Sequence, residues 1–547
     1  MRVILSSTGR SFRWAQSHAS AEHGFTMVIA LGVLLVTSLL LTATFYAVSG
    51  EIHIGTDNLA SKRAYAAASA GVQAYLYQMN QNPNYWETCT NNTQSTAVTV
   101  PGSSDNASYT FKPIYANGNT GCTTNVINSL VDSTTGTIRI VFTGSAGTRP
   151  VVQRAILVSF RMDSPLDFLW YTHFESVDKG IPGGPSPAYG DCGVFYRNSR
   201  DGNCNIVWIS QDKMNGPAYT DDQYLINPGA SPTFGRTPAD KIESSAPGTS
   251  AADICSGSNC QSAVFKGTPV YNAKPIPTPS DNSELLTDAK TYGNYYQGTT
   301  QVTLNGNSAS VTTCATSTTC TTGTVNLVNQ PIIYVDNASG CTTTAYTPFG
   351  VTYPANSAGH FYGCSGDVYV SGNYTTPVTI GAANNVIING SITTSADSNS
   401  NPTGAATLGL VANEFVRVMH GLNGSDSSSG CSTTNNAAQT LTSPTIDAAV
   451  LALNHSFIVD NYNCGGSDGT LSVHGAIAQY FRGPVGQPNG SGGILNGYAK
   501  NYNYDDRLAN ILPPYLFDIS DSGWHISRET LCTPPGVGSN STGTVCQ

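Results

Sequence analysis

The chain has 547 residues, too many for one hydrophobic core, so several structural units are expected. Charged residues make up only 11% of it, against about 25% in an average soluble domain. The 34 acidic and 24 basic residues give a net charge of −10. Because there is no basic stripe to neutralise phosphates, the sequence argues against nucleic acid as a partner.

The first 24 residues precede an apolar segment. Residues 25–48 contain no charged side chain, whereas Arg2, Arg10 and Arg13 come before them. As a helix this segment is about 36 Å long, enough to cross a bilayer. The positive-inside rule then places residues 1–24 in the cytoplasm and the bulk of the chain outside. We therefore expect a single-pass membrane protein whose large part is extracellular or on the cell surface.

The apolar segment allows three interpretations. A cleaved secretory signal, with Ala47-Val48-Ser49 as its cleavage site, normally has a shorter apolar core of about 7–15 residues. A plain membrane anchor is the second. The third uses the junction Glu22-His23-Gly24-Phe25-Thr26-Met27, which resembles the processing site of type IV prepilins. That resemblance implies that residues 1–24 are a leader, that a prepilin peptidase cuts after Gly24, and that the new amino group of Phe25 is methylated.

A second helical pattern follows the apolar segment. Tyr65, Val72, Leu76 and Met79 are spaced 7, 4 and 3 residues apart, and Pro83 ends the pattern. We therefore expect a pilin-like helix over residues 25–82, with its transmembrane span at 25–48. Its alanine-rich stretch, residues 64–71, resembles PilX-type minor pilins. The resemblance implies that the helix packs against other pilin or pseudopilin subunits.

Ile29 is a departure from this resemblance. It is the fifth residue counted from Phe25, where most major pilins have a glutamate that pairs with the amino group of the neighbouring subunit. A subunit without that carboxylate is not recruited in this way. Ile29 therefore favours a minor subunit at the tip or at the start of a filament. The competing interpretation is an anchor that never polymerises.

The 14 cysteines predict disulfide bonds rather than metal binding. None lies in a CxxC pair or at a zinc-site spacing from histidine, so we expect neither a metal site nor a cofactor. Local bridges in polar loops suit an oxidising compartment. Neighbour pairing, one of the connectivities that the sequence allows, joins Cys89 to Cys122, Cys192 to Cys204, Cys255 to Cys260, Cys314 to Cys320, Cys341 to Cys364, Cys431 to Cys464, and Cys532 to Cys546.

Mainly β structure is expected after the helix. Within residues 89–163, alternating runs at 108–111, 138–142 and 151–160 predict a small antiparallel sheet of a pilin-like domain. From 164 to 530, short aliphatic strands recur with a glycine in register, as in residues 368–374. This pattern favours a right-handed parallel β-helix, with a β-sandwich as the alternative. Residues 531–547 are expected to form a disulfide-bearing tail.

Three stretches of the expected β-helix add a second resemblance. Residues 216–222, 482–486 and 498–517 look like the exported β-helix region behind PilX-like N-termini in pilus-assembly proteins. This likeness implies an architecture and no activity. A surface glycan or a protein is the kind of ligand expected for it.

Catalytic signatures were sought because parallel β-helices often host polysaccharide lyases and glycoside hydrolases. The sequence has no HExxH or Walker A motif, so no catalytic residue is assigned. The best acids, Asp221 with Asp222 and Asp505 with Asp506, are adjacent and point apart on a strand. We interpret His360 and His420 as structural. Exposed tyrosines able to stack on sugars or on a partner protein are expected at Tyr295, Tyr296, Tyr498, Tyr502 and Tyr504, although we favour tyrosines of asparagine-rich loops without such a function.

These observations predict a minor pilin or pseudopilin-like structural subunit that presents an extracellular β-helix for adhesion or assembly. The alternative is a membrane-anchored carbohydrate-active enzyme, recognisable by two carboxylates about 5–10 Å apart in a cleft. A plain surface-anchored protein is the third hypothesis.

Overall fold

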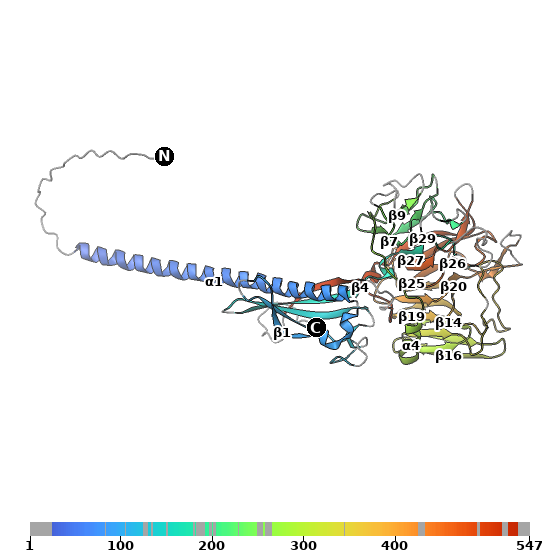
Figure 1. Ribbon diagram of the computed structural model, residues 1–547, viewed down its shortest axis with the longest axis horizontal. Coiled ribbons are helices and arrows are strands. Elements are labelled where there is room, and N and C mark those ends of the chain that lie inside the picture. The colour runs from blue at the N-terminus through green and yellow to red at the C-terminus, as the bar shows by residue number, and fades with distance from the viewer. Residues whose placement is uncertain are drawn as a thin grey trace, which may run out of the picture.

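A computed structural model of the chain describes residues 25–533 apart from internal segments at 83, 104–105, 117, 124–128, 133–134, 149–150, 179–180, 182–191, 196–199, 201–203, 228, 249–254, 257–264, 344, 425–432, 490–492 and 517–522, and without the side chains of 25–26, 49–55 and 256. The chain forms a long N-terminal helix, a small sheet beside its second half, and a tall stack of strands beyond its C-terminal end (Figure 1). The protein is mainly β, as expected.

The first unit, called the head below, is a five-stranded antiparallel sheet with the second half of α1 (Phe25–Gln81) packed on one face. Its strand order is β1-β2-β3-β4-β30. The strands are β1 (Gln94–Thr99), β2 (Ser108–Pro113), β3 (Ile138–Ala146), β4 (Val152–Met162) and β30 (Trp524–Cys532), with the short 3₁₀ turns η1 (Tyr85–Glu87) and η2 (Cys89–Asn92) following the helix. The antiparallel sheet predicted within residues 89–163 is confirmed for β1 to β4.

Small residues let the helix approach the sheet closely. Ala64 and Ala68 are fully buried, and a Cβ placed on Gly144 of β3 would overlap the backbone of both. Further along, the buried ring of Tyr75 lies 5.2 Å from Phe160 and 5.4 Å from Phe111, centroid to centroid. The alanine-rich stretch is therefore the contact surface between helix and sheet, and an aromatic cluster fills the wider gap beyond it.

The predicted apolar stripe of this helix is displaced at one position. Val72 and Met79 are buried as expected, and Leu76 is half-buried, but Tyr65 is 40% exposed. The buried face runs instead through Ala64, because the tight approach leaves no room for a ring. The hydroxyl of Tyr65 donates to Glu529 Oε1 of β30 at 3.0 Å.

The second unit, called the stack below, is built from three parallel ladders that successive turns of the chain visit in the same order. Ladder 1 contains β12 (Thr268–Val270), β10 (Lys241–Ser244), β7 (Ala218–Thr220), β5 (Trp170–Phe174), the second halves of β27 (Ser467–Phe481) and β25 (Thr445–Ala452), then β21 (Leu408–Ala412), β19 (Val378–Ala382), β17 (Ile332–Asp336) and β13 (Asn294–Gln297).

Ladder 2 contains the first halves of β14 (Thr300–Gly306), β18 (Val368–Tyr374) and β20 (Val386–Thr393), followed by β22 (Val416–Val418) and β26 (Phe457–Val459). Ladder 3 contains the second halves of β14, β18 and β20, the first halves of β25 and β27, and β29 (Ile494–Tyr504), β6 (Lys213–Asn215) and β9 (Thr233–Phe234). Parallel pairing between successive turns differs from the antiparallel pairing of a β-sandwich.

Short elements complete the stack. They are the helices η3 (Pro165–Asp167), α4 (Ser283–Tyr292) and η7 (Asp506–Ala509), and the strands β8 (Tyr224–Leu225), β11 (Cys255–Ser256), β15 (Ser308–Cys314), β16 (Cys320–Asn326), β23 (His420–Leu422), β24 (Asn435–Thr440) and β28 (Gly486–Pro488). The sequence did not predict α4, a ten-residue helix in which only Leu285 and Ala289 are buried.

The order of strands along ladder 1 differs from a simple sequential solenoid. β5 lies beside β27, so the chain enters the stack in its middle and builds toward β12 first. A covering segment, residues 271–282, then returns to the opposite end of the stack, where α4 and β13 begin. It contacts ladder 1 along its length: Ala273 N donates to the carbonyl of Ser244 at 2.9 Å, Tyr171 Oη donates to the carbonyl of Ile276 at 2.6 Å, and Asn282 Nδ2 donates to the carbonyl of Ala382 at 2.9 Å.

The stack is an insertion in the head. β4 ends at Met162, residues 163–523 form the stack and its connections, and β30 returns to pair with β4. The two connections touch, because Asp163 N donates to the carbonyl of Gly523 at 2.9 Å. This differs from the boundary expected at residue 530: residues 524–530 belong to the head sheet. Their alternation of apolar and polar side chains fitted either sheet, so the sequence did not distinguish them.

Disulfide bonds cross-link the loops of both units. Cys89–Cys122, Cys192–Cys204, Cys314–Cys320 and Cys341–Cys364 are bonded, which confirms four of the expected pairings. Cys255, Cys464 and Cys532 are also in disulfides. Their expected partners Cys260, Cys431 and Cys546 lie outside the described residues.

Candidate functional site

The first half of α1 is an uncovered apolar surface. By length and composition Met27–Val48, 22 residues, is able to cross a membrane, and none of it is buried against the rest of the chain. Its hydroxyls are satisfied within the helix: Thr37 Oγ1 donates to the carbonyl of Val33 at 2.8 Å, and Thr42 Oγ1 to that of Ser38 at 2.7 Å. Internal satisfaction of polar groups is what a lipid environment requires. This helix is consistent with a single-pass membrane anchor.

Of the two expected processing residues, Phe25 is the first residue of this helix. Gly24 lies outside the described residues. Ile29 is 51% exposed on the uncovered half, so an apolar side chain stands at the position where major pilins carry a carboxylate. The cut after Gly24 and the methylation of Phe25 stay predictions.

The four acids singled out in the sequence contact separate partners. Asp221 Oδ2 contacts His173 Nδ1 at 2.7 Å, whereas Asp222 pairs with the buried Arg200. The two adjacent carboxylates therefore face different partners, although they lie in the bend after β7 and not on a strand as expected.

Asp505 and Asp506 behave in the same way. Asp505 Oδ2 lies 2.7 Å from Arg507 Nη2, and Asp506 Oδ2 lies 2.8 Å from Arg236 Nη1. Neither pair presents two free carboxylates to a shared space.

The two histidines singled out in the sequence have different surroundings. His420 is fully buried, with Nδ1 2.9 Å from the carbonyl oxygen of Asp460 and Nε2 2.9 Å from Asn435 Oδ1. Burial raises the pKa of the neighbouring Asp468 to about 6. His360 lies in a turn, where its backbone N donates to Asn356 Oδ1 at 3.0 Å.

Three of the tyrosines expected to be exposed are buried, which corrects that expectation. Tyr498, Tyr502 and Tyr504 point into the stack with exposures of 1%, 0% and 9%. Their large rings fill the interior at β29, and Tyr504 Oη donates to the carbonyl of Leu166 at 3.0 Å. Tyr296 is half-buried, and Tyr295 Oη donates to Asp336 Oδ2 at 2.9 Å.

A histidine that the sequence did not single out lies at a polar cavity of about 760 Å³. His455 Nδ1 contacts the buried Asp178 at 2.7 Å and Nε2 contacts Glu414 at 2.8 Å. Burial alone lowers the pKa of His455, but the hydrogen bonds to the two carboxylates outweigh it and raise the pKa to about 9. The ring is therefore a cation at neutral pH, locked between two anions, and stacks on Phe415 at 4.3 Å.

Arg417 at the same cavity is also committed to an ion pair. Its Nε and Nη2 donate to the two oxygens of Asp460 at 2.9 Å each, and its guanidinium lies 4.2 Å from the ring centre of Tyr346. Both cations at this cavity are thus neutralised by the chain itself. The arrangement stabilises ladder 2 and the segment that covers it.

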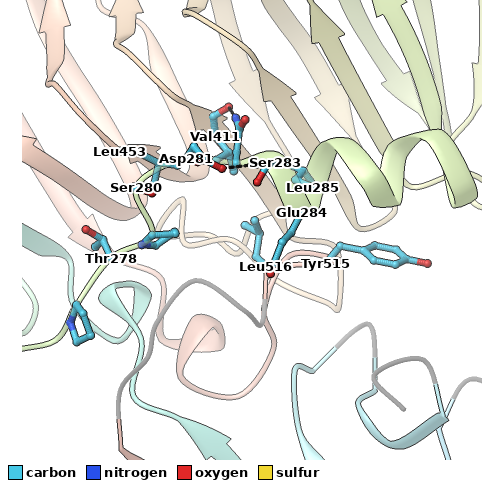
Figure 2. A pocket seen from close by; sticks show the side chains of 13 residues that line it. Thr278, Ser280, Asp281, Ser283, Glu284, Leu285, Val411, Leu453, Tyr515 and Leu516 are labelled. Atoms are coloured by element: carbon cyan, nitrogen blue, oxygen red, sulfur yellow. Dashed lines mark hydrogen bonds between the residues drawn. The ribbon is translucent and has the colours of Figure 1, made fainter. Parts of the chain in front are cut away.

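A further cavity, of about 540 Å³, lies outside ladder 1 (Figure 2). It is lined by the end of the covering segment and the start of α4, residues 277–285, by Tyr515 and Leu516 of the returning chain, and by Val411 and Leu453 of the stack. Leu285 and Leu516 pack where Gly381 and Gly409 leave space on the strands. The cavity is the gap between two segments that cover ladder 1.

Among the described residues, no group of three or more His, Cys, Asp or Glu side chains is arranged to hold a metal ion.

No protein-family model and no curated protein sequence matches the chain. Among solved structures, the chain is similar to the crystal structure of the competence-associated pilin ComZ from Thermus thermophilus, with 17% identity and a TM-score of 0.27. The match covers 86% of this chain and 97% of that one. With so low a TM-score, we base the interpretation of the N-terminal region on its own contacts.

Proposed function

We propose that the chain is a pilin-like structural subunit, anchored by α1 and assembled with other pilin or pseudopilin subunits. The observation that carries this proposal is the division of α1: its second half packs on an antiparallel sheet, whereas Met27–Val48 is apolar and uncovered. An uncovered apolar half serves first as a membrane span and then as the packing surface of a filament. The proposal rests on the PilX-type resemblance of residues 22–80 and on the contacts between the second half of α1 and the head sheet.

The subunit occupies the end of a filament, as a tip or initiating minor pilin. The stack lies beyond the C-terminal end of α1 (Figure 1), and we take this to be the side on which no further subunit is added. A unit of this size at that place blocks further growth on its side. Ile29 supports the same position, because a terminal subunit has no preceding amino group to neutralise.

The stack is the presented part, and we assign it as a right-handed parallel β-helix. Three parallel ladders visited in the same order support a helical coil, and crossover connections between parallel strands are right-handed in about 98% of cases. Its role is adhesion or assembly outside the cell, with residues 1–24 in the cytoplasm before a prepilin peptidase removes them.

The proposed role is not enzymatic. Of the candidate acids, Asp222, Asp505 and Asp506 are each paired with an arginine, and Asp221 contacts His173. A glycoside hydrolase requires a carboxylic acid and a second carboxylate across one bond. Incubating the full chain with polysaccharides and finding no new reducing ends is the expected result, and sustained release of sugars would contradict it.

Mass spectrometry of the mature N-terminus tests the pilin-like role. Chain purified from native membranes should begin at N-methylated Phe25. A Gly24→Trp variant should keep Met1, because the peptidase site needs a small residue, whereas Gly24→Ala should still be cut. An intact Met1 in the unmodified chain, or a mature N-terminus near Ser49, would contradict the proposal.

A further inference from the structure

The outer surface of ladder 3 carries polar side chains in two columns. Strand register places Thr445 beside Ser472 and Ser472 beside Asn501, and places Asp447 beside His474 and His474 beside Asn503. Ladder 1, by contrast, is covered by residues 271–285 and 508–516. Successive members of a column are separated by one strand spacing, about 4.8 Å. These columns offer a regular polar surface that crosses the turns of the stack.

One wall turns this surface into a cavity of about 580 Å³. The wall is a loop from Thr394 to Thr403, closed by a bridge between Ala396 and Pro402. Asp397 Oδ1 accepts hydrogen bonds from the backbone N of Asn399 at 2.8 Å and of Asn401 at 2.9 Å, which holds the loop. Thr394 N donates to Asp447 Oδ2 at 3.0 Å and ties the loop to the floor.

Hydrogen bonds along the floor orient its side chains. Asn215 Nδ2 donates to Asn503 Oδ1 at 3.0 Å, Asn503 Nδ2 to Asn501 Oδ1 at 3.3 Å, and Asn501 Nδ2 to Ser472 Oγ at 3.2 Å. Each amide in this chain keeps a second N–H and further lone pairs for a ligand. The floor therefore offers donors and acceptors side by side, which is the pattern that a hydroxyl group satisfies.

The charge of the cavity excludes other ligand classes. Asp447 is the one acid and His474 the one basic side chain among the residues that line it, and they are paired at 2.9 Å through His474 Nδ1. The cavity lining has no unpaired cation that would bind an anionic polymer, and it has only one carboxylate that would bind a metal ion. A protein partner prefers aromatic anchors, and no Phe, Tyr, Trp, Leu, Ile or Val lines the cavity.

We propose that this cavity, called the amide cavity, binds a neutral glycan whose chain runs across the strands, with Asn501, Asn503 and His474 Nε2 contacting sugar hydroxyls. The strand spacing is close to the length of one pyranose unit, so successive sugars meet equivalent side chains. Because the cavity offers one carboxylate, the glycan is held and not cut. The proposal depends on the proposed function only in placing the stack outside the cell.

The test is calorimetric titration of the full chain in detergent micelles with cellohexaose, maltohexaose and chitohexaose, and with hexagalacturonate as the acidic probe. At least one neutral hexasaccharide should bind, and hexagalacturonate should not. The double variant Asn501→Ala/Asn503→Ala should weaken binding about tenfold or more, since each lost hydrogen bond contributes about 1 kcal/mol. Ser472→Tyr, which places a ring between the two columns and keeps the amides, should abolish it.

The matched control is Asn305→Ala, an exposed asparagine on β14 of the same ladder and outside the cavity. It should bind as the unmodified chain does. The proposal is overturned if the chain binds hexagalacturonate alone or binds none of the four oligosaccharides. It is also overturned if the control and the double variant lose affinity equally. Urea denaturation shows whether each variant is folded. If the N-terminus is not processed but the chain still binds glycan, the proposed role in a filament is contradicted, whereas the proposal for the amide cavity is supported.

Discussion

In the head, one helix supplies the apolar side chains that cover the sheet, whereas in the stack each turn of chain covers the next. The head core is aliphatic and aromatic, with Tyr75 at its centre. The stack encloses charges as well: Glu175 is fully buried and accepts hydrogen bonds from Trp170, Trp208 and Arg482. Among the described residues of the head strands one charge is buried, that of Arg161 on β4, and it pairs at 2.7 Å with Asp167 of the connection to the stack. The stack pairs such charges in its own interior.

The largest expected effect is the loss of a buried ion pair in the stack. Arg417→Met leaves Asp460, which is fully buried, without its cation. The free energy of unfolding of the stack should fall by about 3–5 kcal/mol. Peptide-resolved hydrogen exchange should show the loss in β18 to β27 and not in β2 to β4.

The control is Lys241→Met. Lys241 Nζ is 4.0 Å from Glu243 and its side chain is 69% exposed, so the change should stay within about 0.5 kcal/mol. Faster exchange in the head of the Arg417 variant would show that the two units unfold together and would break the comparison.

The next effect belongs to the head. Gly144→Ala places a methyl group against the backbone of Ala64 and Ala68, which cannot move aside, and should cost about 3 kcal/mol. Exchange should rise in α1 and β3. Gly323→Ala in β16, where nothing lies within 4 Å, is the matched control and should leave exchange unchanged. A tolerated Gly144→Ala would mean that helix and sheet do not touch as described.

The contribution of His455 should depend on pH. Its folded pKa, about 9, lies above the unfolded value of about 6.5, so its stabilisation is complete below pH 6.5 and is lost as the pH rises through 9. Allowing for partial exposure, the loss is of the order of 2 kcal/mol. Urea midpoints at pH 6 and 9.5 should differ more for the unmodified chain than for His455→Gln. Equal differences would contradict the ion-paired geometry.

The smallest effects concern the attachment of β30. Asn80 exchanges two hydrogen bonds with the backbone of Trp524, at 3.0 and 2.9 Å. Asn80→Ala should cost about 1–2 kcal/mol. Tyr65→Phe removes only the exposed bond to Glu529 and should cost less than about 0.5 kcal/mol. If thermal unfolding shows that Tyr65→Phe is the more destabilising variant, β30 is attached to the head mainly by the exposed bond to Glu529 and not by Asn80.

Sequence patterns predicted the local features of both units. Charge-free residues 25–48 and the apolar spacing at Val72 and Met79 determine the helix, and alternation gives β2, β3 and β4. Recurrent glycine in strands indicated parallel turns. Each of these signals is a local pattern of composition or spacing, so the sequence alone reveals it.

The long-range features were beyond those patterns. The pairing of β5 with β27 and of β30 with β4 joins segments hundreds of residues apart. Asp178 reaches His455 across a separation of 277 residues. The tyrosines of β29 were expected outside because their asparagine-rich surroundings resemble a loop, whereas strand alternation turns Tyr498 and Tyr502 inward.

Gold labelling of sheared filaments tests the central claim most directly. An epitope inserted at the exposed turn around Val328, at the far end of the stack, should be recognised without disturbing either core. The proposed function predicts gold particles at one end of each filament. Particles spread along the length, or filaments without any, would contradict it.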